Sequence, residues 1–567
     1  MLNPFNLRKF RIIFGLGLSL ALLFCWDCSQ RDMNANHQSF TKFAVSFDAS
    51  VRNEPTSGRI LLLLSRTNKF STDENGTPFF GKNVNGLKPG EKAFFNEKVI
   101  GYTVRSLKNI PAGDYYARAY LNVYTTFHRS DGHTVKLHMD QGEGQNWRRS
   151  PGNLYSQPQK IHFDPNNSQT ISINMDKKIP PLPPFKETKW VKYVRIKSKL
   201  VSEFWGQPMY IAARVLLPKG FYEHPNVHYP VVYMVGHFPR GHPGYPGGFM
   251  EDGGNPAYPL TKAWTSDNLP RMILVRFEHA NPYFDDSYGV NSKNVGPYGD
   301  ALTKELIPYV EKKFRGLGKG YSRLLTGGST GGWISLAMQV FNSDFFGGTW
   351  TFYPDPIDFR HYGEVNLYKD ENAYYVEHEW TKVPRPAMRK PDGSIVFTME
   401  QANHCEEVLG DRYRSGGQFA IWDALFAPVA EDGYPKPLFD PWTGKIDHEV
   451  SAWAKEHYDV VYYLKKNWPT VGPKLVGKLN IYCGRMDHFY LTNGVYALED
   501  FLKTTKNPHY SGSFTYSPRG GHGWNPWFTD TLDLDPDERL FIEMYLEMAE
   551  HIAKNAPKGE NSSLWHY

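Results

Sequence analysis

Residues 323–341 read RLLTGGSTGGWISLAMQVF: an apolar segment, a run of small residues around Ser329, and a second apolar segment. Residues 324–326 predict the end of a buried strand, and residues 333–341 predict a helix. The six residues 327–332 then form a sharp turn, which leaves no room for bulky neighbours beside a strained central residue. The stretch predicts a strand–turn–helix unit with Ser329 at its apex. The alternative is a glycine-rich turn with an incidental serine.

Strands and helices alternate on both sides of this unit. Segments 229–235 and 272–277 are short and apolar, which predicts buried strands, and 300–314 has helical spacing. We therefore expect an α/β domain over 190–560, with a parallel sheet covered on both faces. The stretch 360–450 breaks the alternation and is interpreted as an insertion, either a lid with substrate-binding loops or a surface elaboration.

The segment 40–176 has a different pattern. Short runs with a two-residue period, such as 115–124, are separated by turn residues and predict a β-sandwich of immunoglobulin-like type. Residues 177–189 follow and contain IPPLPP at 179–184. A proline-rich stretch favours extended polyproline geometry, so we place a semi-rigid linker and the domain boundary there.

The first 28 residues have the pattern of a secretory or lipoprotein signal. Arg8, Lys9 and Arg11 precede an apolar run over 12–24, and Cys25 and Cys28 follow it. The alternative is a single N-terminal anchor helix. Each reading predicts an exported protein, whether periplasmic, on the outer surface or secreted, with or without a lipid anchor.

The composition excludes several classes of protein. Of the 567 residues 40% are hydrophobic and 22% charged, which excludes a disordered chain. The net charge of +5 includes the three basic residues of the signal, so it offers no reason to expect nucleic acid as a partner. Four cysteines exclude a disulfide-dense scaffold. With the signal removed, Cys405 and Cys483 remain, and they could pair in an oxidising compartment.

A serine nucleophile requires a base and a carboxylate, and in folds of this kind they follow in the order Ser, Asp or Glu, His. Asp487 follows a predicted strand at 479–484, and His522 lies between glycines just after a predicted strand at 513–516. We expect Ser329, Asp487 and His522 to form the catalytic triad. Asp355 is the competing carboxylate and Asp358 a weaker one.

The oxyanion of the reaction requires two backbone N–H donors. We expect Thr330, the residue after the serine, to supply one of them. The second should come from the loop after the strand at 229–235, with Phe238 as first choice and His237 as second. Pro239 has no N–H group and is excluded.

These motifs resemble the putative esterase family of α/β-hydrolases, which includes esterase D, feruloyl and acetylxylan esterases, and enterochelin esterases. The matching segments run in the family's order across about 190–550: YPVVY at 229–233, ELIPYVE at 305–311, GGSTGG at 327–332, the 484–487 loop, and GHGW at 521–524. The resemblance implies an α/β-hydrolase fold and a serine carboxylesterase without a metal or organic cofactor. The order Gly236-His237 departs from the family's usual His-Gly, and the N-terminal β-sandwich lies outside the resemblance.

Three aromatic residues, Tyr245, Trp524 and Trp527, could line an acyl or sugar pocket, or belong to the core. We expect no metal site, because the histidines between 224 and 242 do not have zinc-ligand spacing. The expected substrate is a small-molecule or polysaccharide ester.

Two alternative functions stay open. A serine peptidase like prolyl oligopeptidase shares the serine motif and the chain order, but 40–176 is too short for its β-propeller. The other is an inactive hydrolase domain in a carbohydrate-binding surface protein.

Overall fold

The α/β part of the molecule is built around an eight-stranded sheet in the order β13-β14-β16-β15-β19-β20-β25-β26. The computed structural model describes residues 40–237, 258–267, 269–524, 526 and 539–560, so the expected signal at 1–28 lies outside the described residues. The strands are β13 (Val191–Ser198), β14 (Met209–Leu216), β15 (Val231–Met234), β16 (Ile273–Glu278), β19 (Arg323–Gly328), β20 (Gly348–Phe352), β25 (Leu479–Gly484) and β26 (Ser513–Ser517).

The sheet is mixed, which corrects the expectation of a parallel one. From β16 to β26 the neighbouring strands are parallel, whereas β13 pairs antiparallel with β14, and β14 with β16. Residues 199–208 between β13 and β14 hold only the short helix α1 (Lys199–Trp205). Parallel strands need a crossover of about a dozen residues or more, so this connection returns the chain antiparallel.

Helices cover both faces of the sheet. Helix α5 (Thr330–Phe341) packs on β19 and β20, and α9 (Val460–Leu475) lies between α5 and α10 (Thr492–Thr504). The opposite face is covered by α11 (Arg539–Asn555), where Trp350 of β20 donates to Glu547 at 3.3 Å. The expected helix at 300–314 is π-helical over 301–306 and continues as α4 (Ile307–Phe314).

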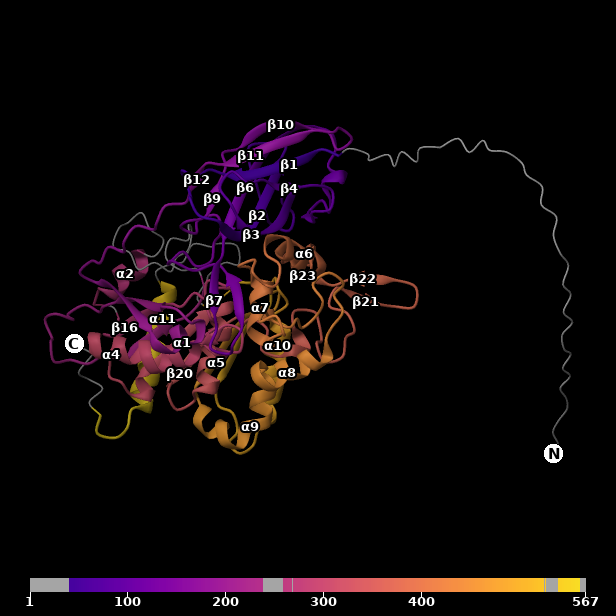
Figure 1. Cartoon of the computed structure of the whole chain (residues 1–567). Coiled ribbons are helices and arrows are strands. Elements are labelled where there is room, and N and C mark those ends of the chain that lie inside the picture. Colours follow the sequence, from indigo (N-terminus) through magenta and orange to yellow (C-terminus); the bar gives the residue numbers. More distant parts are fainter. Residues whose placement is uncertain (1–39, 238–257, 268, 525, 527–538, 561–567) are drawn as a thin grey trace, which may run out of the picture. The chain divides into compact units, whose positions relative to one another are not determined.

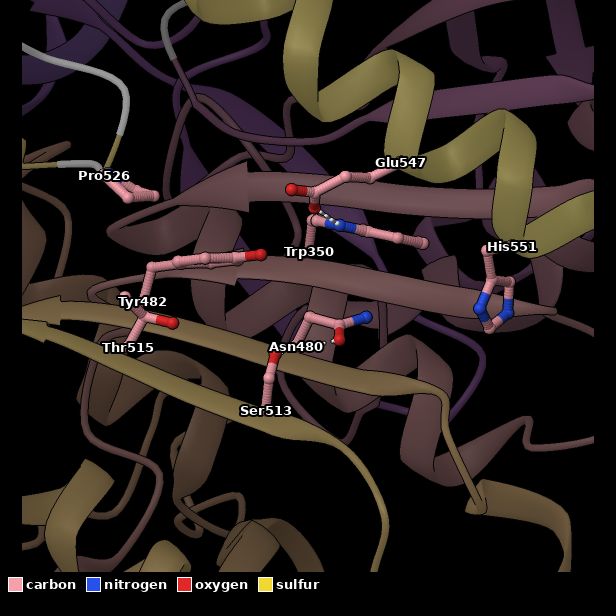
Figure 2. A pocket seen from close by; sticks show the side chains of 8 residues that line it. All are labelled: Trp350, Asn480, Tyr482, Ser513, Thr515, Pro526, Glu547 and His551. Atoms are coloured by element: carbon pink, nitrogen blue, oxygen red, sulfur yellow. Dashed lines mark hydrogen bonds between the residues drawn. The ribbon is translucent and has the colours of Figure 1, made fainter.

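A pocket of about 430 Å³ lies between α11 and the strands (Figure 2). Strand residues on the face away from α5 line it, together with Glu547 and His551 of α11. The Nε2 atom of His551 contacts the carbonyl oxygen of Gly347 at 2.8 Å. The strand residues are Trp350, Asn480, Tyr482, Ser513 and Thr515.

The N-terminal β part, residues 42–178, contains two sheets that share one apolar cluster. One sheet has the order β11-β1-β4 and the other β12-β9-β6-β2-β3-β5, with β10 paired to β6. Its immunoglobulin-like type stays a prediction. The strands are β1 (Lys42–Phe47), β2 (Thr56–Ser65), β3 (Phe79–Leu87), β4 (Ala93–Phe95), β5 (Gly101–Tyr102), β6 (Gly113–Val123), β9 (Leu154–Tyr155), β10 (Gln159–Phe163), β11 (Thr170–Met175) and β12 (Lys177–Lys178). Strand β12 shows that the first residues of the expected linker belong to a sheet.

A hairpin joins the N-terminal β part to the α/β core. It consists of β7 (Thr125–His128) and β8 (Thr134–Leu137), which Figure 1 shows among elements of the α/β part. Phe127, Val135 and Leu137 are buried in the main apolar cluster, and the Phe127 ring lies 5.0 Å from that of Trp205. The described residues from 40 onward fall in one compact unit, so packing as well as the 177–189 stretch connects the two parts.

The stretch 360–450 also connects them. It contains two small hairpins, β21 (Tyr375–Glu377) with β22 (Lys382–Pro384) and β23 (Pro386–Arg389) with β24 (Ile395–Thr398). Helices α6 (Met399–Leu409) and α7 (Gln418–Phe426) follow, and α8 (His448–Tyr458) begins at its end. Helix α6 contacts β3 and β5, and Arg59 of β2 donates to the carbonyl oxygen of Val408 at 2.9 Å. The insertion therefore packs against the N-terminal β part.

The two cysteines within the described residues are free and buried. Cys405 contacts the carbonyl oxygen of Thr72, and Cys483 the hydroxyl of Thr492, so they do not form a disulfide with each other. None of the helices in the described ranges combines the length and apolar character needed to cross a membrane.

Candidate active site

Ser329 lies at the turn between β19 and α5, as the sequence pattern predicts. Its backbone has φ 58° and ψ −123°, a conformation that non-glycine residues rarely adopt and that stores strain. The turn is held by the Ser329 N–H, which donates to Phe352 O at 3.1 Å. A Cβ on Gly331 would collide with the carbonyl oxygen of Val235, so only glycine fits where helix and strand approach so closely.

The histidine and the aspartate predicted from the sequence meet at this turn. His522 Nε2 lies 3.0 Å from Ser329 Oγ, and its Nδ1 lies 2.8 Å from Asp487 Oδ2. The three side chains form one hydrogen-bonded series, although they are up to 193 positions apart in the chain. Each follows a strand of the parallel part of the sheet, so all three come to the same edge.

The surroundings of Asp487 and His522 hold both in place. Asp487 is fully buried, and its Oδ1 accepts from the N–H groups of Phe489 at 2.9 Å and Leu491 at 3.2 Å. Its Oδ2 is thus left for the imidazole. The His522 ring lies between the rings of Tyr353 and Phe489, at 4.7 and 4.9 Å. Because these contacts fix the ring plane, both imidazole nitrogens are aimed at their partners.

The competing carboxylates have other positions. Asp355 lies beside Ser329, with Oδ1 3.5 Å from its Oγ, and its Oδ2 accepts from Tyr288 at 2.7 Å, Thr330 at 3.0 Å and Gln418 at 3.0 Å. Burial raises the pKa of Asp355, despite these hydrogen bonds. Asp358 forms an ion pair with Arg360 and caps a short 3₁₀ turn. Among the described residues, Asp487 is the carboxylate bonded to His522.

Of the residues predicted to donate to the oxyanion, Thr330 and His237 lie within the described part of the chain and Phe238 does not. Thr330 is the first residue of α5, where the backbone N–H has no partner within the helix. His237 follows β15, and its ring lies 5.7 Å from Phe284 with Nδ1 3.5 Å from Asp285. Its carbonyl oxygen accepts from Arg276 at 2.8 Å. Phe238 lies outside the described residues, so the second donor stays a prediction.

One of the three predicted pocket aromatics, Trp524, lies within the described part of the chain. Trp524 is half-buried and packs against the main apolar cluster, which agrees with the reading as core. Tyr245 and Trp527 lie outside the described residues. In the ranges that the structure covers, no group of three or more His, Cys, Asp or Glu side chains could hold a metal ion.

Three residues near Ser329 were missed by the sequence analysis: Tyr288, Gln418 and Trp422. Trp422 Nε1 donates to Tyr288 Oη at 2.7 Å, and Gln418 also contacts that hydroxyl. Helix α7, which carries Gln418 and Trp422, is buried on all sides and therefore lacks the periodicity that marks a surface helix. Only the fold brings α7 next to Asp355.

Comparison with known proteins finds a family match for part of the chain. The family model described as "Esterase: Putative esterase" matches residues 206–399. This segment is therefore similar to the putative-esterase family. The resemblance found in the sequence is thereby confirmed for these residues. The matched segment includes Ser329 and Asp355 but ends before Asp487 and His522. These two residues are assigned to the site by their contacts with Ser329 and with each other.

No curated protein sequence matches the chain significantly. Among solved structures, a ferulic acid esterase is 15% identical with a TM-score of 0.35, over 64% of this chain and 98% of its own. An S-formylglutathione hydrolase from Agrobacterium tumefaciens is 12% identical, with a TM-score of 0.32, and the match covers 65% of this chain and 97% of its own. A fluorophosphonate-binding serine hydrolase from Staphylococcus aureus is 12% identical, with a TM-score of 0.31, and the match covers 64% of this chain and 98% of its own.

These structural likenesses are weak, so we base the function on the family match and the geometry of the site. The match to the putative-esterase family, with a serine that is hydrogen-bonded to a histidine and a histidine bonded to an aspartate, indicates a serine hydrolase that acts on esters.

Proposed function

We propose that Ser329, His522 and Asp487 are the catalytic triad of a carboxylesterase that works through an acyl-enzyme. The observation that carries the proposal is the position of His522, which contacts Ser329 Oγ with one nitrogen and Asp487 Oδ2 with the other. A base must lie within hydrogen-bond distance of the proton that it takes. The 3.0 Å contact between His522 Nε2 and Ser329 Oγ meets this requirement.

In the first half of the reaction, Ser329 Oγ bonds to the ester carbonyl carbon while its proton passes to His522 Nε2. The tetrahedral intermediate collapses, the bond to the alcohol oxygen breaks, and His522 returns the proton to the leaving alcohol. In the second half, water loses a proton to His522 and bonds to the acyl carbonyl carbon. The bond to Ser329 Oγ then breaks, and His522 returns the proton to Ser329 Oγ as the acid leaves. Asp487 stabilises the imidazolium that forms in each half.

The negative oxygen of each intermediate is stabilised by two backbone N–H groups in this proposal. Thr330 supplies one, because its N–H lies at the first position of α5 next to the nucleophile. Phe238 or His237 supplies the other from the loop after β15. Removing one such donor typically costs about 10²–10³ in kcat.

The cellular location and the substrate belong to the same proposal. The basic and apolar pattern of residues 1–28 supports export, to the periplasm, the outer surface or the medium, with or without a lipid anchor. The esterase match supports a carboxylic ester as substrate. Acyl and feruloyl esters of polysaccharides, and small-molecule esters, are the candidates.

The test is the purified Ser329→Ala variant beside the wild type and Ser394→Ala, whose side chain lies in an exposed loop. We expect wild type and Ser394→Ala to hydrolyse short-chain aryl esters and to bind one fluorophosphonate per chain. Ser329→Ala should lose at least about 10³-fold in kcat/KM and bind no fluorophosphonate, with an unchanged circular dichroism spectrum. Retained hydrolysis in Ser329→Ala would overturn the proposal. Hydrolysis assays of the wild type with acetylated and feruloylated polysaccharides then test which of these esters it cleaves.

A further inference from the structure

A second cavity, of about 320 Å³, lies where the N-terminal β part, the loops of the α/β part and the insertion meet. The N-terminal β part contributes Thr72 and residues 143–149. The α/β part contributes His237, Phe284 and Asp285, and the insertion contributes Leu409 and residues 415–418. We call this cavity the three-part cleft. Its volume is in the range of ligand pockets for small molecules.

The three-part cleft lies beside the nucleophile. Gln418, which lines it, donates through Nε2 to Asp355 Oδ2 at 3.0 Å and to Thr330 Oγ1 at 3.2 Å. Asp355 and Thr330 both adjoin Ser329. His237, which also lines the three-part cleft, belongs to the loop from which the second oxyanion donor is expected. Whatever occupies the three-part cleft therefore lies next to a carbonyl group bound at Ser329.

The carboxylates that line the three-part cleft each face a histidine. Glu143 is buried, and its Oε1 lies 2.7 Å from His138 Nε2. Burial opposes the charged form of His138, but the hydrogen bond and negative charge of Glu143, together with smaller contributions from Val123 and Asp140, raise the His138 pKa. In the same way, burial opposes protonation of His237 and nearby Asp285 raises its pKa. The negative charges of both acids are thus partly balanced within the protein.

Two arginines, Arg148 and Arg149, add positive charge to the lining of the three-part cleft. Arg148 donates through Nη2 to Thr72 Oγ1 at 2.8 Å, and its guanidinium lies 4.9 Å from the centre of the Trp147 ring. Both partners are neutral, and within the described residues Arg148 forms no ion pair. Arg149 interacts electrostatically with Glu143 and Asp285. The guanidinium of Arg148 is the group best placed to receive a carboxylate from a ligand.

The loop that carries Arg148 is held in shape by hydrogen bonds from its own polar side chains. Asp140 accepts from the N–H groups of Gly142 at 3.0 Å and Gly144 at 2.7 Å. Gln145 donates to the carbonyl oxygen of His138 at 3.2 Å, and Glu143 accepts from Gln141 N at 2.8 Å. Because the loop is ordered before a ligand arrives, binding costs less conformational entropy.

We infer that the three-part cleft binds a carboxylate-bearing portion of the ester substrate, with Arg148 as the residue that selects for it. This inference rests on the proposed function, because the same ester must have its carbonyl group at Ser329. It assigns a specificity role to the N-terminal β part, which lies outside the esterase match. It also makes the insertion one wall of the substrate site.

The test compares esters that differ only in charge. On the acyl side, the 4-nitrophenyl monoesters of adipic and suberic acid are paired with their neutral methyl-capped forms. On the alcohol side, the acetate of 3-(4-hydroxyphenyl)propanoic acid is paired with that of its methyl ester. We expect wild type to prefer the charged member by about tenfold or more in kcat/KM in one of the two arms. Equal rates within the pairs of both arms would overturn the inference, and this comparison needs no variant.

Variants then assign the preference to Arg148. Arg148→Gln should abolish the preference for the charged ester, mainly by raising KM for that ester, while hydrolysis of the neutral ester is unchanged. Arg148→Lys should keep part of the preference. Arg66→Gln is the matched control, because Arg66 lies over Tyr115 and does not line the three-part cleft. A preference that persists in Arg148→Gln would overturn the assignment. Failure of the wild type to hydrolyse any of the esters would instead contradict the proposed function, and the inference with it.

Discussion

Asp355 Oδ1 lies 3.5 Å from Ser329 Oγ, so a second carboxylate adjoins the hydroxyl that His522 contacts at 3.0 Å. The two aspartates near the site therefore have different tasks. Asp487 orients the imidazole, whereas Asp355 ties Thr330 and the insertion residue Gln418 to the nucleophile turn.

This division predicts unequal effects of isosteric substitutions. Asp487→Asn should lower kcat by about 10³–10⁴, because the amide cannot stabilise the imidazolium and favours the wrong tautomer. Asp355→Asn should lower kcat by about tenfold or less, since the side-chain oxygen of the new amide would still accept from Thr330 and Tyr288. Steady-state kinetics with one aryl ester measures both. If Asp355→Asn were the more damaging of the two, Asp355 would be the carboxylate that acts in catalysis.

The nucleophile turn predicts a strict requirement for glycine at position 331. Gly331→Ala should lower activity by at least about 10²-fold and destabilise the fold, because the new methyl group would collide with the carbonyl oxygen of Val235. Gly494→Ala in α10 is the control: its new Cβ meets its nearest neighbour at 3.4 Å. Alanine there should leave activity unchanged and stabilise the helix by about 0.5–1 kcal/mol. Thermal unfolding and ester hydrolysis are the measurements, and full activity in Gly331→Ala would contradict this account of the turn.

The β7–β8 hairpin predicts that the N-terminal β part and the α/β core unfold together. Phe127→Ala should lower the free energy of unfolding by about 3–5 kcal/mol, because the fully buried ring packs against Trp205. Phe94→Ala is matched in chemistry but 41% exposed, and should cost less than about 1 kcal/mol. Urea unfolding followed by tryptophan fluorescence and by loss of activity measures both. Two separate transitions, with only the first shifted in Phe127→Ala, would show that the parts unfold independently.

Glu406 predicts a pH dependence of stability. Its carboxylate is enclosed between α6 and the start of α7, where it accepts from Ala420 N at 2.7 Å, and burial raises its pKa from 4.5 to about 7. The folded state thus holds a proton that the unfolded state releases. The resulting stabilisation is complete below pH 4.5 and is lost as the pH rises through about 7.

We therefore expect Glu406→Gln to gain stability relative to wild type, on the order of 2 kcal/mol, between pH 4.5 and pH 7.5. Urea unfolding at a series of pH values gives the difference between the two proteins. Buried acids that do not interact with Glu406 contribute equally to both proteins and cancel in that difference, whereas Asp423, whose pKa Glu406 helps to raise, adds to it. Glu379→Gln, at an exposed position, should follow the wild type at every pH. A difference between Glu406→Gln and wild type that did not vary with pH would contradict the assignment.

Much of the catalytic core could be predicted because its signals are local. The turn around Ser329 needs small residues. Asp487 follows a strand that ends in glycine, and His522 lies between two glycines after a strand, so each position carries its own sequence pattern. The expectation of a parallel sheet was wrong for β13 and β14, because strand direction depends on the length and path of the connection rather than on strand composition.

By itself, the sequence determined the candidate serine, histidine and carboxylates and their order in the chain, because strand ends and glycine turns are local patterns of neighbouring residues. Only the tertiary structure decided which carboxylate reaches His522, since Asp355 and Asp487 both follow strands of the same sheet. It also decided that Arg148 and Gln418, which come from distant segments of the chain, line one cleft beside Ser329. Contacts of this kind depend on how separate segments pack, and no local pattern encodes them.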